Sequence, residues 1–238
     1  MPSVICVTRA EAFTARLDAL AARAGAAISP AEVLQLFWYY ELLIQWNEAV
    51  NLTALPLSDY PEESLSRLIV EPIVAAQVVP ATQIAWVDIG SGGGSPAIPL
   101  KVVRPLARLI LAEPRQRKVA FLREVVRMLG LTETQVTGKR VEDGVAPPSS
   151  IDLATVRRVK MDATLVQATR ACLRDRGRLL AFGVALPDRY LCPDGGVDTP
   201  QFQQLPNSPL DLRGIAPEAD ETGVNPRPFR PLFVYDCR

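Results

Sequence analysis

Apolar residues recur at helical spacing through the first 80 positions of the chain. Residues 10–24 alternate alanine, leucine and charged side chains with a helical period, and we expect no regular structure in residues 1–9. Ser29 and Glu32 form a capping box, which marks the start of a second helix. The apolar stripe of this helix, which we interpret mainly as core packing, consists of Leu34, Phe37, Trp38, Leu42 and Trp46.

A change of pattern follows a third helix, which we expect over 61–79 with a bend or break at Pro72. From residue 84 onward, apolar runs alternate with amphipathic segments, which is typical of parallel strands joined by helices. A last apolar strand at 231–235 follows a tail rich in proline and glycine (187–231), and we expect it to close a sheet edge. The other expected strands are 84–89, 108–113, 134–138, 151–157 and 178–185, and the expected helices are 96–103, 115–129 and a helix capped by Asp162 that ends at Gly177.

These elements predict an α/β fold, a doubly wound and mostly parallel sheet with an N-terminal helical cap. We divide the chain into the helical cap (1–80) and one compact α/β domain (81–238). At 238 residues with 48% apolar residues, the chain is long enough for a sizeable core.

The turn after the first expected strand carries the main chemical signal. Asp88 lies near the end of this strand, and alternating glycines then allow the backbone to approach a ligand closely. The second strand ends at Glu113, where a carboxylate is suited to both ribose hydroxyls of a nucleoside. A dinucleotide turn would need a sixth-position glycine where this chain has Ser95, so the pattern favours S-adenosylmethionine over NAD, with a purely structural turn as the alternative. The alternating glycines are Gly90, Gly92 and Gly94.

Composition limits the reactions and the binding partners that we expect. The 26 basic and 26 acidic residues balance, so any affinity for RNA must come from a local basic patch. The chain has no histidine, which excludes Ser-His and Cys-His nucleophiles, and we expect no metal site. We expect a reduced, cytoplasmic protein with no membrane span and no signal peptide. Its four cysteines are far apart, at Cys6, Cys172, Cys192 and Cys237.

Four motifs resemble those of the bacterial glucose-inhibited division protein B family, the guanine-N7 methyltransferases of small-subunit ribosomal RNA. The resemblance covers residues 31–185. The glycine turn extends to Ile98-Pro99-Leu100, as in the family pattern V-D-[VI]-G-[TS]-G-x-G-x-P-G-I-P-L. The other matches are Trp46–Thr53 to W-N-x-x-x-N-L-T, Arg117–Leu122 to K-R-x-x-F-L, and Arg140–Glu142 to R-V-E.

The chain departs from the family pattern at three places. The R-H-x-x-D-S segment has lost its histidine and exchanged Asp for Glu, and it is Arg67-Leu68-Ile69-Val70-Glu71-Pro72 here. The S-R-A segment keeps only its arginine, in Val156-Arg157-Arg158. A lysine that members often carry is replaced near Gly183. The cofactor turn is thus retained, while positions that face the RNA or the target base are altered.

The resemblance implies a class I S-adenosylmethionine-dependent methyltransferase that acts on 16S ribosomal RNA. It implies that Arg157 acts at the reaction centre and lies near the cofactor. Asn51, which the N-terminal helical cap would present to the substrate, is a second candidate at the reaction centre, with a structural turn as the alternative. Guanine N7 carries a lone pair and no proton, so the reaction needs no general base, in agreement with the absence of histidine. We expect a monomer whose partner is small-subunit ribosomal RNA or the subunit itself. The expected cofactor-binding residues are Asp88, Gly90, Gly92, Gly94, Ser95, Glu113, Val141, Glu142 and Arg157.

Two other functions stay open at this point. A divergent relative would methylate another RNA or a small molecule, which the replacements at Leu68 and Gly183 favour. A non-catalytic module would bind the cofactor or the ribosome without methyl transfer. RNA contact is expected from Arg157, Arg158 and Lys160, and from the basic residues of the helix at 115–129, whose default interpretation is a solvated face.

Overall fold

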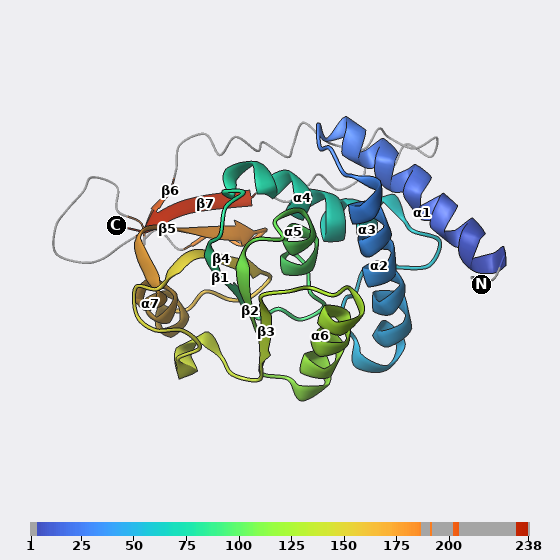
Figure 1. Ribbon diagram of the computed structural model, residues 1–238. Helices are drawn as coiled ribbons and strands as arrows, with labels where there is room; N and C mark the ends of the chain where they lie inside the picture. Colours follow the sequence, from blue (N-terminus) through green and yellow to red (C-terminus); the bar gives the residue numbers. More distant parts are fainter. Residues whose placement is uncertain (1–3, 187–190, 192–201, 205–231, 238) are drawn as a thin grey trace.

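A seven-stranded sheet organises the part of the chain that the computed structural model describes, which is residues 4–186, 191, 202–204 and 232–237 (Figure 1). The strand order is β3-β2-β1-β4-β5-β7-β6. The first five strands are parallel, whereas β7 is antiparallel to both β5 and β6. The strands are β1 (Ala85–Ile89), β2 (Arg108–Ala112), β3 (Thr134–Thr137), β4 (Ile151–Arg157), β5 (Leu173–Phe182), β6 (Phe202–Gln204) and β7 (Leu232–Cys237).

The order in which strands are added to the sheet reverses between the parallel neighbours β1 and β4. The chain passes from β1 outward to β2 and β3, and then returns to β4 on the other side of β1. Such a switch point opens a crevice at the carboxyl ends of the two central strands. The observed sheet confirms the predicted doubly wound, mostly parallel α/β fold.

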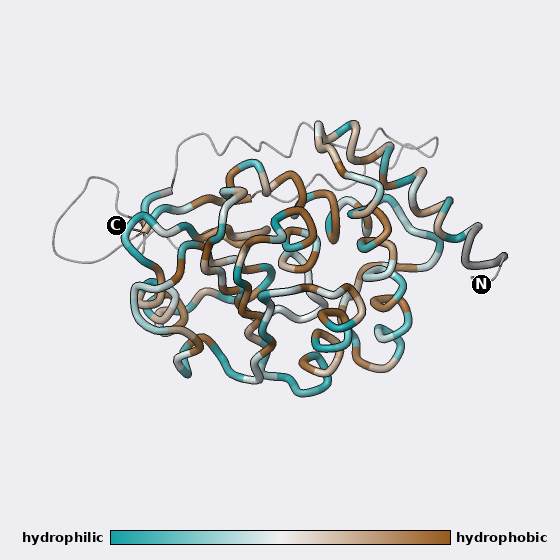
Figure 2. Tube along the Cα trace, in the orientation of Figure 1, coloured by the Kyte–Doolittle hydropathy of each residue, from teal (hydrophilic) through white to brown (hydrophobic). Residues whose placement is uncertain are grey.

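Helices cover both faces of this sheet. Helices α1 to α6 share one hydrophobic cluster with the sheet, and α7 packs in a second cluster on the opposite face (Figures 1 and 2). The α-helices are α1 (Val4–Arg23), α2 (Pro30–Val50), α3 (Glu62–Leu65), α4 (Glu71–Ala75), α5 (Ala97–Val103), α6 (Gln116–Met128) and α7 (Ala163–Cys172). Shorter turns are the π-helical η1 (Ser66–Val70) and the 3₁₀ turns η2 (Ala76–Val78) and η3 (Val141–Asp143).

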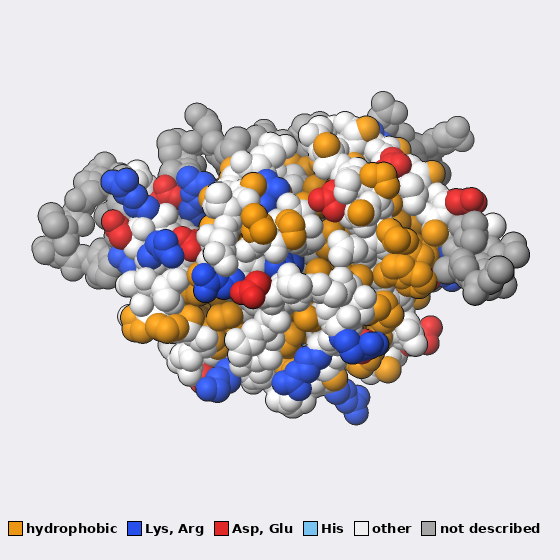
Figure 3. Space-filling model, viewed as in Figure 1, with side chains coloured by type: hydrophobic (Ala, Val, Ile, Leu, Met, Phe, Trp, Pro, Cys, Tyr) orange, Lys and Arg blue, Asp and Glu red, His pale blue; other side chains and the backbone are white. Residues whose placement is uncertain are grey.

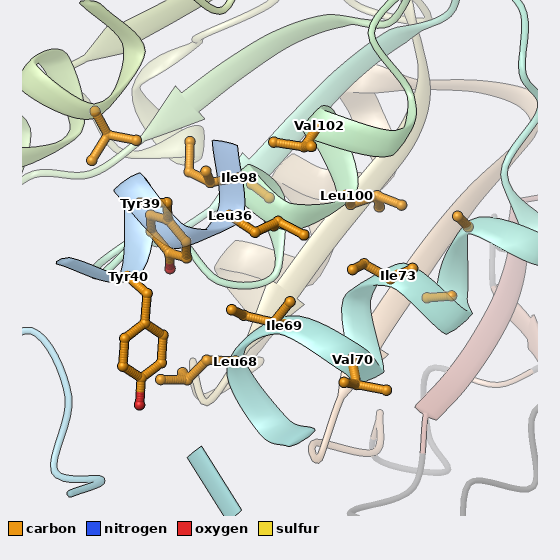
Figure 4. Close-up of a cluster of buried hydrophobic side chains, with 14 of the residues drawn as sticks. Leu36, Tyr39, Tyr40, Leu68, Ile69, Val70, Ile73, Ile98, Leu100 and Val102 are labelled. Atoms are coloured by element: carbon orange, nitrogen blue, oxygen red, sulfur yellow. The ribbon is translucent and has the colours of Figure 1, made fainter. Parts of the chain in front are cut away.

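The cap and the sheet are joined through continuous apolar packing. Figure 4 shows Leu36 and Tyr39 of α2 beside Ile69 and Ile73 of the segment before β1, with Ile98 of α5 among them. All five side chains are buried. The division at residue 80 is therefore a division of the sequence rather than a break in the core.

The capping box at the start of α2 is confirmed. The Ser29 hydroxyl accepts from the Glu32 N–H at 3.3 Å, and the Glu32 carboxylate accepts from the Ser29 N–H at 2.7 Å. The third helix also forms, and its irregularity lies just before Pro72, where η1 replaces a regular α-turn. Proline has no N–H to donate to the preceding turn, so the regular hydrogen-bond ladder is interrupted there.

Two predicted helix boundaries were wrong. Helix α1 begins at Val4, inside the segment 1–9 that we expected to lack regular structure. Helix α7 ends at Cys172 instead of Gly177, because Leu173 already pairs with Ile151 of β4. Residues 174–177 then form a bulge before pairing with β4 resumes at Arg178. Because most of these residues are charged, the sequence lacks the alternation of apolar and polar positions that indicates a strand.

The C-terminal strand forms but does not close the edge. Strand β7 lies between β5 and β6, so the edge is β6, a three-residue strand that the apolar pattern did not reveal. Most of the segment 187–231 lies outside the described residues.

Candidate active site

A cavity of about 540 Å³ opens at the carboxyl ends of β1, β2 and β4, at the switch point of the sheet. The sheet contributes the turns that follow these strands, and the cap contributes the loop after α2 together with Arg67 and Leu68 of η1. The wall includes residues 51–55, 89–93, 112–115, 140–142 and 157–160. Both parts of the molecule therefore build the site.

Eight of the ten predicted site residues line this cavity. They are Asn51, Gly90, Gly92, Ser95, Glu113, Val141, Glu142 and Arg157. The other two, Asp88 and Gly94, lie behind the wall, and the structure gives each of them a local role described below. Sequence reasoning thus located the cavity from the two strand ends and the family motifs.

Glu113 is fixed by backbone groups from two turns. Its Oε2 accepts from the Gly92 N–H and its Oε1 from the Arg115 N–H, both at 2.9 Å. The residue is 5% exposed and lines the cavity. Each carboxylate oxygen has capacity for a further hydrogen bond. The side chain is therefore held in one orientation with acceptor capacity remaining at the cavity wall.

The glycines of the turn serve different needs. Gly92 has φ +53°, and a Cβ built there would meet only the Gly90 carbonyl at 3.6 Å, so that position borders open space. A Cβ on Gly94 would lie 2.8 Å from Cγ1 of Ile98 in α5. Close packing thus requires glycine at position 94, whereas the cavity lies next to position 92. Tyr39 of α2 secures the turn, because its hydroxyl donates to the Gly93 carbonyl at 2.7 Å.

Asp88 belongs to a buried polar chain within the sheet. Its Oδ1 accepts from the Thr155 hydroxyl at 2.5 Å, and Thr155 in turn accepts from the Trp86 indole N–H at 2.9 Å. Its Oδ2 is buried without a hydrogen-bond partner among the described residues. Burial raises the pKa of Asp88 to about 6, although Thr155, Ser91 and Arg157 act in the opposite direction.

Arg157 lies at the end of β4 and makes two contacts that sequence reasoning missed. Its Nη2 pairs with Oε2 of Glu71 at 2.9 Å, and the two side chains are 13% and 2% exposed. Its Cζ lies 4.7 Å from the centre of the Phe182 ring. Glu71 was noticed only as a departure from the family pattern, and no local signal connects residues that are 86 positions apart.

Asn51 owes its conformation to the end of α2. It adopts φ +51° and ψ +67°, the left-handed cap conformation in which asparagine is favoured. Asn47 then accepts from the Leu52 and Thr53 N–H groups at 2.7 and 2.9 Å. These contacts give the W-N-x-x-x-N-L-T motif a structural reason, and they place the side of the loop that carries Asn51 at the cavity.

The cavity wall is basic although the whole chain is neutral. Its two acidic residues are Glu113 and Glu142, against seven basic ones. Figure 3 shows further Lys and Arg side chains over α6. No group of three or more potential metal-ligating side chains is found within the described part of the chain. The basic residues of the wall are Arg67, Arg115, Lys118, Arg140, Arg157, Arg158 and Lys160.

The model of a protein family described as rRNA small subunit methyltransferase G matches residues 32–187, most of the chain. The chain belongs to this family. Among its methyltransferase G relatives, the Laribacter hongkongensis protein is 37% identical over 180 residues, which cover 74% of this chain and 82% of that protein. The Edwardsiella ictaluri protein is 36% identical over 195 residues, which cover 80% and 85%.

A solved structure of a SAM-dependent methyltransferase from Aquifex aeolicus is also similar. It is 11% identical with a TM-score of 0.47, over 73% of this chain and 92% of that one. Among the described helices, none combines the length and the apolar character that a membrane crossing requires. Within the methyltransferase G family, this chain keeps the acid and glycines of the turn after β1, and of its replacements at Leu68, Glu71 and Pro72 only Leu68 lines the cavity.

Proposed function

We propose that the protein is an S-adenosylmethionine-dependent methyltransferase that modifies N7 of a guanine in 16S ribosomal RNA. The observation that carries the proposal is one cavity in which a fixed carboxylate and a glycine turn stand beside seven basic side chains. The carboxylate and the turn suit a nucleoside cofactor, and the basic wall suits a polyanionic substrate. The names of the methyltransferase G relatives support the same assignment.

The residues present fit S-adenosylmethionine. Glu113 has the remaining acceptor capacity that two ribose hydroxyls require, and it is held by backbone hydrogen bonds. Gly92 leaves space beside it for the methionine part, and Val141 and Glu142 are the candidates to flank the adenine. The buried, unpaired Oδ2 of Asp88 provides a negative charge behind the turn that favours a cationic ligand.

When bound, S-adenosylmethionine supplies an electrophilic methyl group. The protein's task is to hold the guanine so that N7 faces that group and to exclude water. Arg157 and Asn51 are the wall residues that we assign to the orientation of the base. No residue has to remove a proton before N7 reacts, so the cavity functions without a general base.

The basic wall favours RNA over a small uncharged substrate. Seven cationic residues against two acids, in a chain with 26 of each charge overall, concentrate positive potential at the cavity. We further propose that the protein acts as a monomer in the cytoplasm, which sedimentation of the purified protein and fractionation of cells would test.

The direct test is methyl transfer from labelled S-adenosylmethionine to small ribosomal subunits that lack this modification, followed by nucleoside analysis. We expect labelled 7-methylguanosine. Label in another nucleoside, or transfer only to free RNA or a small molecule, would favour the divergent enzyme. Cofactor binding without any transfer would instead indicate a non-catalytic module.

A further inference from the structure

The Glu71–Arg157 pair joins the cap to the end of a central strand. Both side chains are largely buried, and the 2.9 Å contact between them spans 86 residues of sequence. The Phe182 ring covers the guanidinium at 4.7 Å. One contact therefore restrains an edge of Arg157 and another restrains its face, so that the planar group has little freedom to rotate.

The π-helical turn before Pro72 places Glu71 for this contact. The Glu71 N–H donates to the Ser66 carbonyl, one residue further back than in an α-helix. The Leu68 carbonyl, whose α-helical partner would be the N–H that Pro72 lacks, accepts from the Ser95 hydroxyl at 2.9 Å. The same turn thus contacts the glycine-turn wall through Ser95 and the β4 wall through Glu71.

Arg157 retains a donor that the protein does not use. Its Nε is buried and has no hydrogen-bond partner among the described residues, although the residue lines the cavity. Buried donors are normally paired, so an unpaired one at a cavity wall indicates that a ligand completes the pairing.

We infer that Glu71 is a positioning residue, which fixes the Arg157 guanidinium so that its unpaired edge donates to an oxygen acceptor of the bound reactants. The inference rests on the proposed function. Two acceptors have the required chemistry, the methionine carboxylate of the cofactor and the O6 carbonyl of the target guanine. Glu71 itself contacts neither of them and acts through Arg157.

The test combines Glu71→Gln, Arg157→Ala and the double variant. Glu71→Gln removes the charge and keeps the size, and we expect kcat for methyl transfer to fall about ten- to a hundred-fold, because a misplaced orienting group costs that much. In the Arg157→Ala background the same change should have almost no further effect. Glu71→Asp, which keeps the charge, should recover much of the loss and guards against a folding defect in Glu71→Gln.

Calorimetric titration with S-adenosylmethionine separates the two acceptors. Weaker cofactor binding in both Glu71→Gln and Arg157→Ala would assign the carboxylate, and unchanged binding with reduced kcat would assign the guanine. Glu62→Gln is the matched control, because Glu62 pairs with Arg23 within the same cap, away from the cavity, and should leave both readouts unchanged.

Two results would overturn the inference. One is a loss of kcat that follows a fall in melting temperature across the variants and is not recovered by Glu71→Asp, which would make the pair a support of the fold. The other is Glu71→Gln with unchanged kcat and cofactor affinity. If the wild-type protein binds the cofactor but transfers no methyl group to subunits, the proposed function fails, and the cofactor titrations still test Glu71.

Discussion

Gly92 and Gly94 of the turn after β1 have different roles, because Gly92 borders the ligand cavity and Gly94 is packed against α5. Gly92→Asp would place a second carboxylate beside Glu113, and we expect cofactor affinity to fall by about a hundred-fold or more, since like charges in contact cost several kcal/mol. Melting temperature should fall only modestly, because φ +53° strains a residue that carries a Cβ but this Cβ meets no side chain. Calorimetry and thermal unfolding measure the two effects, and unchanged affinity would remove Gly92 from the binding site.

Gly94→Ala is the contrasting variant of the same turn. Its Cβ would lie 2.8 Å from Ile98, at a φ of +88° that side chains rarely adopt. We expect a loss of about 1–3 kcal/mol in the free energy of unfolding, from overpacking and backbone strain. Denaturant titration measures this loss. A variant as stable as the wild type would show that α5 moves aside at little cost.

Asp88 makes stability depend on pH. The pKa of Asp88 in the folded state is about 6, above the ordinary value of 3.8. Its protonated carboxyl therefore contributes fully to the free energy of unfolding below about pH 4, and this contribution is lost as the pH rises through 6. The wild type should lose up to about 3 kcal/mol of unfolding free energy over this window relative to Asp88→Asn, which does not titrate. Denaturant titrations of both proteins at several pH values provide the test, and parallel profiles would contradict it.

A single site residue could be predicted from the sequence where its position at a strand end or in a motif determines its role. Glu113 was predicted because it ends the second strand, 25 residues after Asp88 ends the first. Glu71 and Phe182 were not, because their contacts with Arg157 depend on how the cap folds over the sheet. Such long-range partners have no local pattern.

At the scale of elements, the end of α2 shapes one wall of the cavity. Asn47 accepts two backbone hydrogen bonds from Leu52 and Thr53, and no second acceptor for these N–H groups lies in the described part of the chain. Asn47→Ala should lower the free energy of unfolding by about 2 kcal/mol, roughly 1 kcal/mol for each hydrogen bond. Thermal unfolding tests this expectation, with Glu48→Ala as a control on the same helix turn. Equal melting temperatures for the two variants would contradict it.

Element boundaries were predictable where capping chemistry is local. The capping box fixed the start of α2, and Asp162 caps α7 through the Leu165 N–H as expected. The end of α7 was missed because a bulge separates Leu173 from the apolar run at 178–182, so the strand's beginning lacks alternation. Strand β6 has only three residues and depends on β7 for its pairing.

At the scale of the whole molecule, the net charge is zero but the charged side chains are unevenly distributed. The 26 basic and 26 acidic residues balance, yet the cavity wall has a net excess of basic side chains. Composition alone therefore argued only against a uniformly basic nucleic-acid binder. Where the basic residues meet depends on the fold, because they come from the cap, from α6 and from the turns after β3 and β4.

This uneven distribution predicts how RNA binding responds to salt. Affinity for small-subunit RNA should fall steeply as salt rises, because each phosphate contact releases counterions. Lys118 lines the cavity, so Lys118→Ala should lower the slope of log affinity against log salt by about one. Arg127→Ala is the matched control on the same helix, since Arg127 is exposed, pairs with Glu124 and does not line the cavity. Equal slopes for the wild type and Lys118→Ala would place the RNA elsewhere, whereas a reduced slope in both variants would extend the RNA-binding surface along α6.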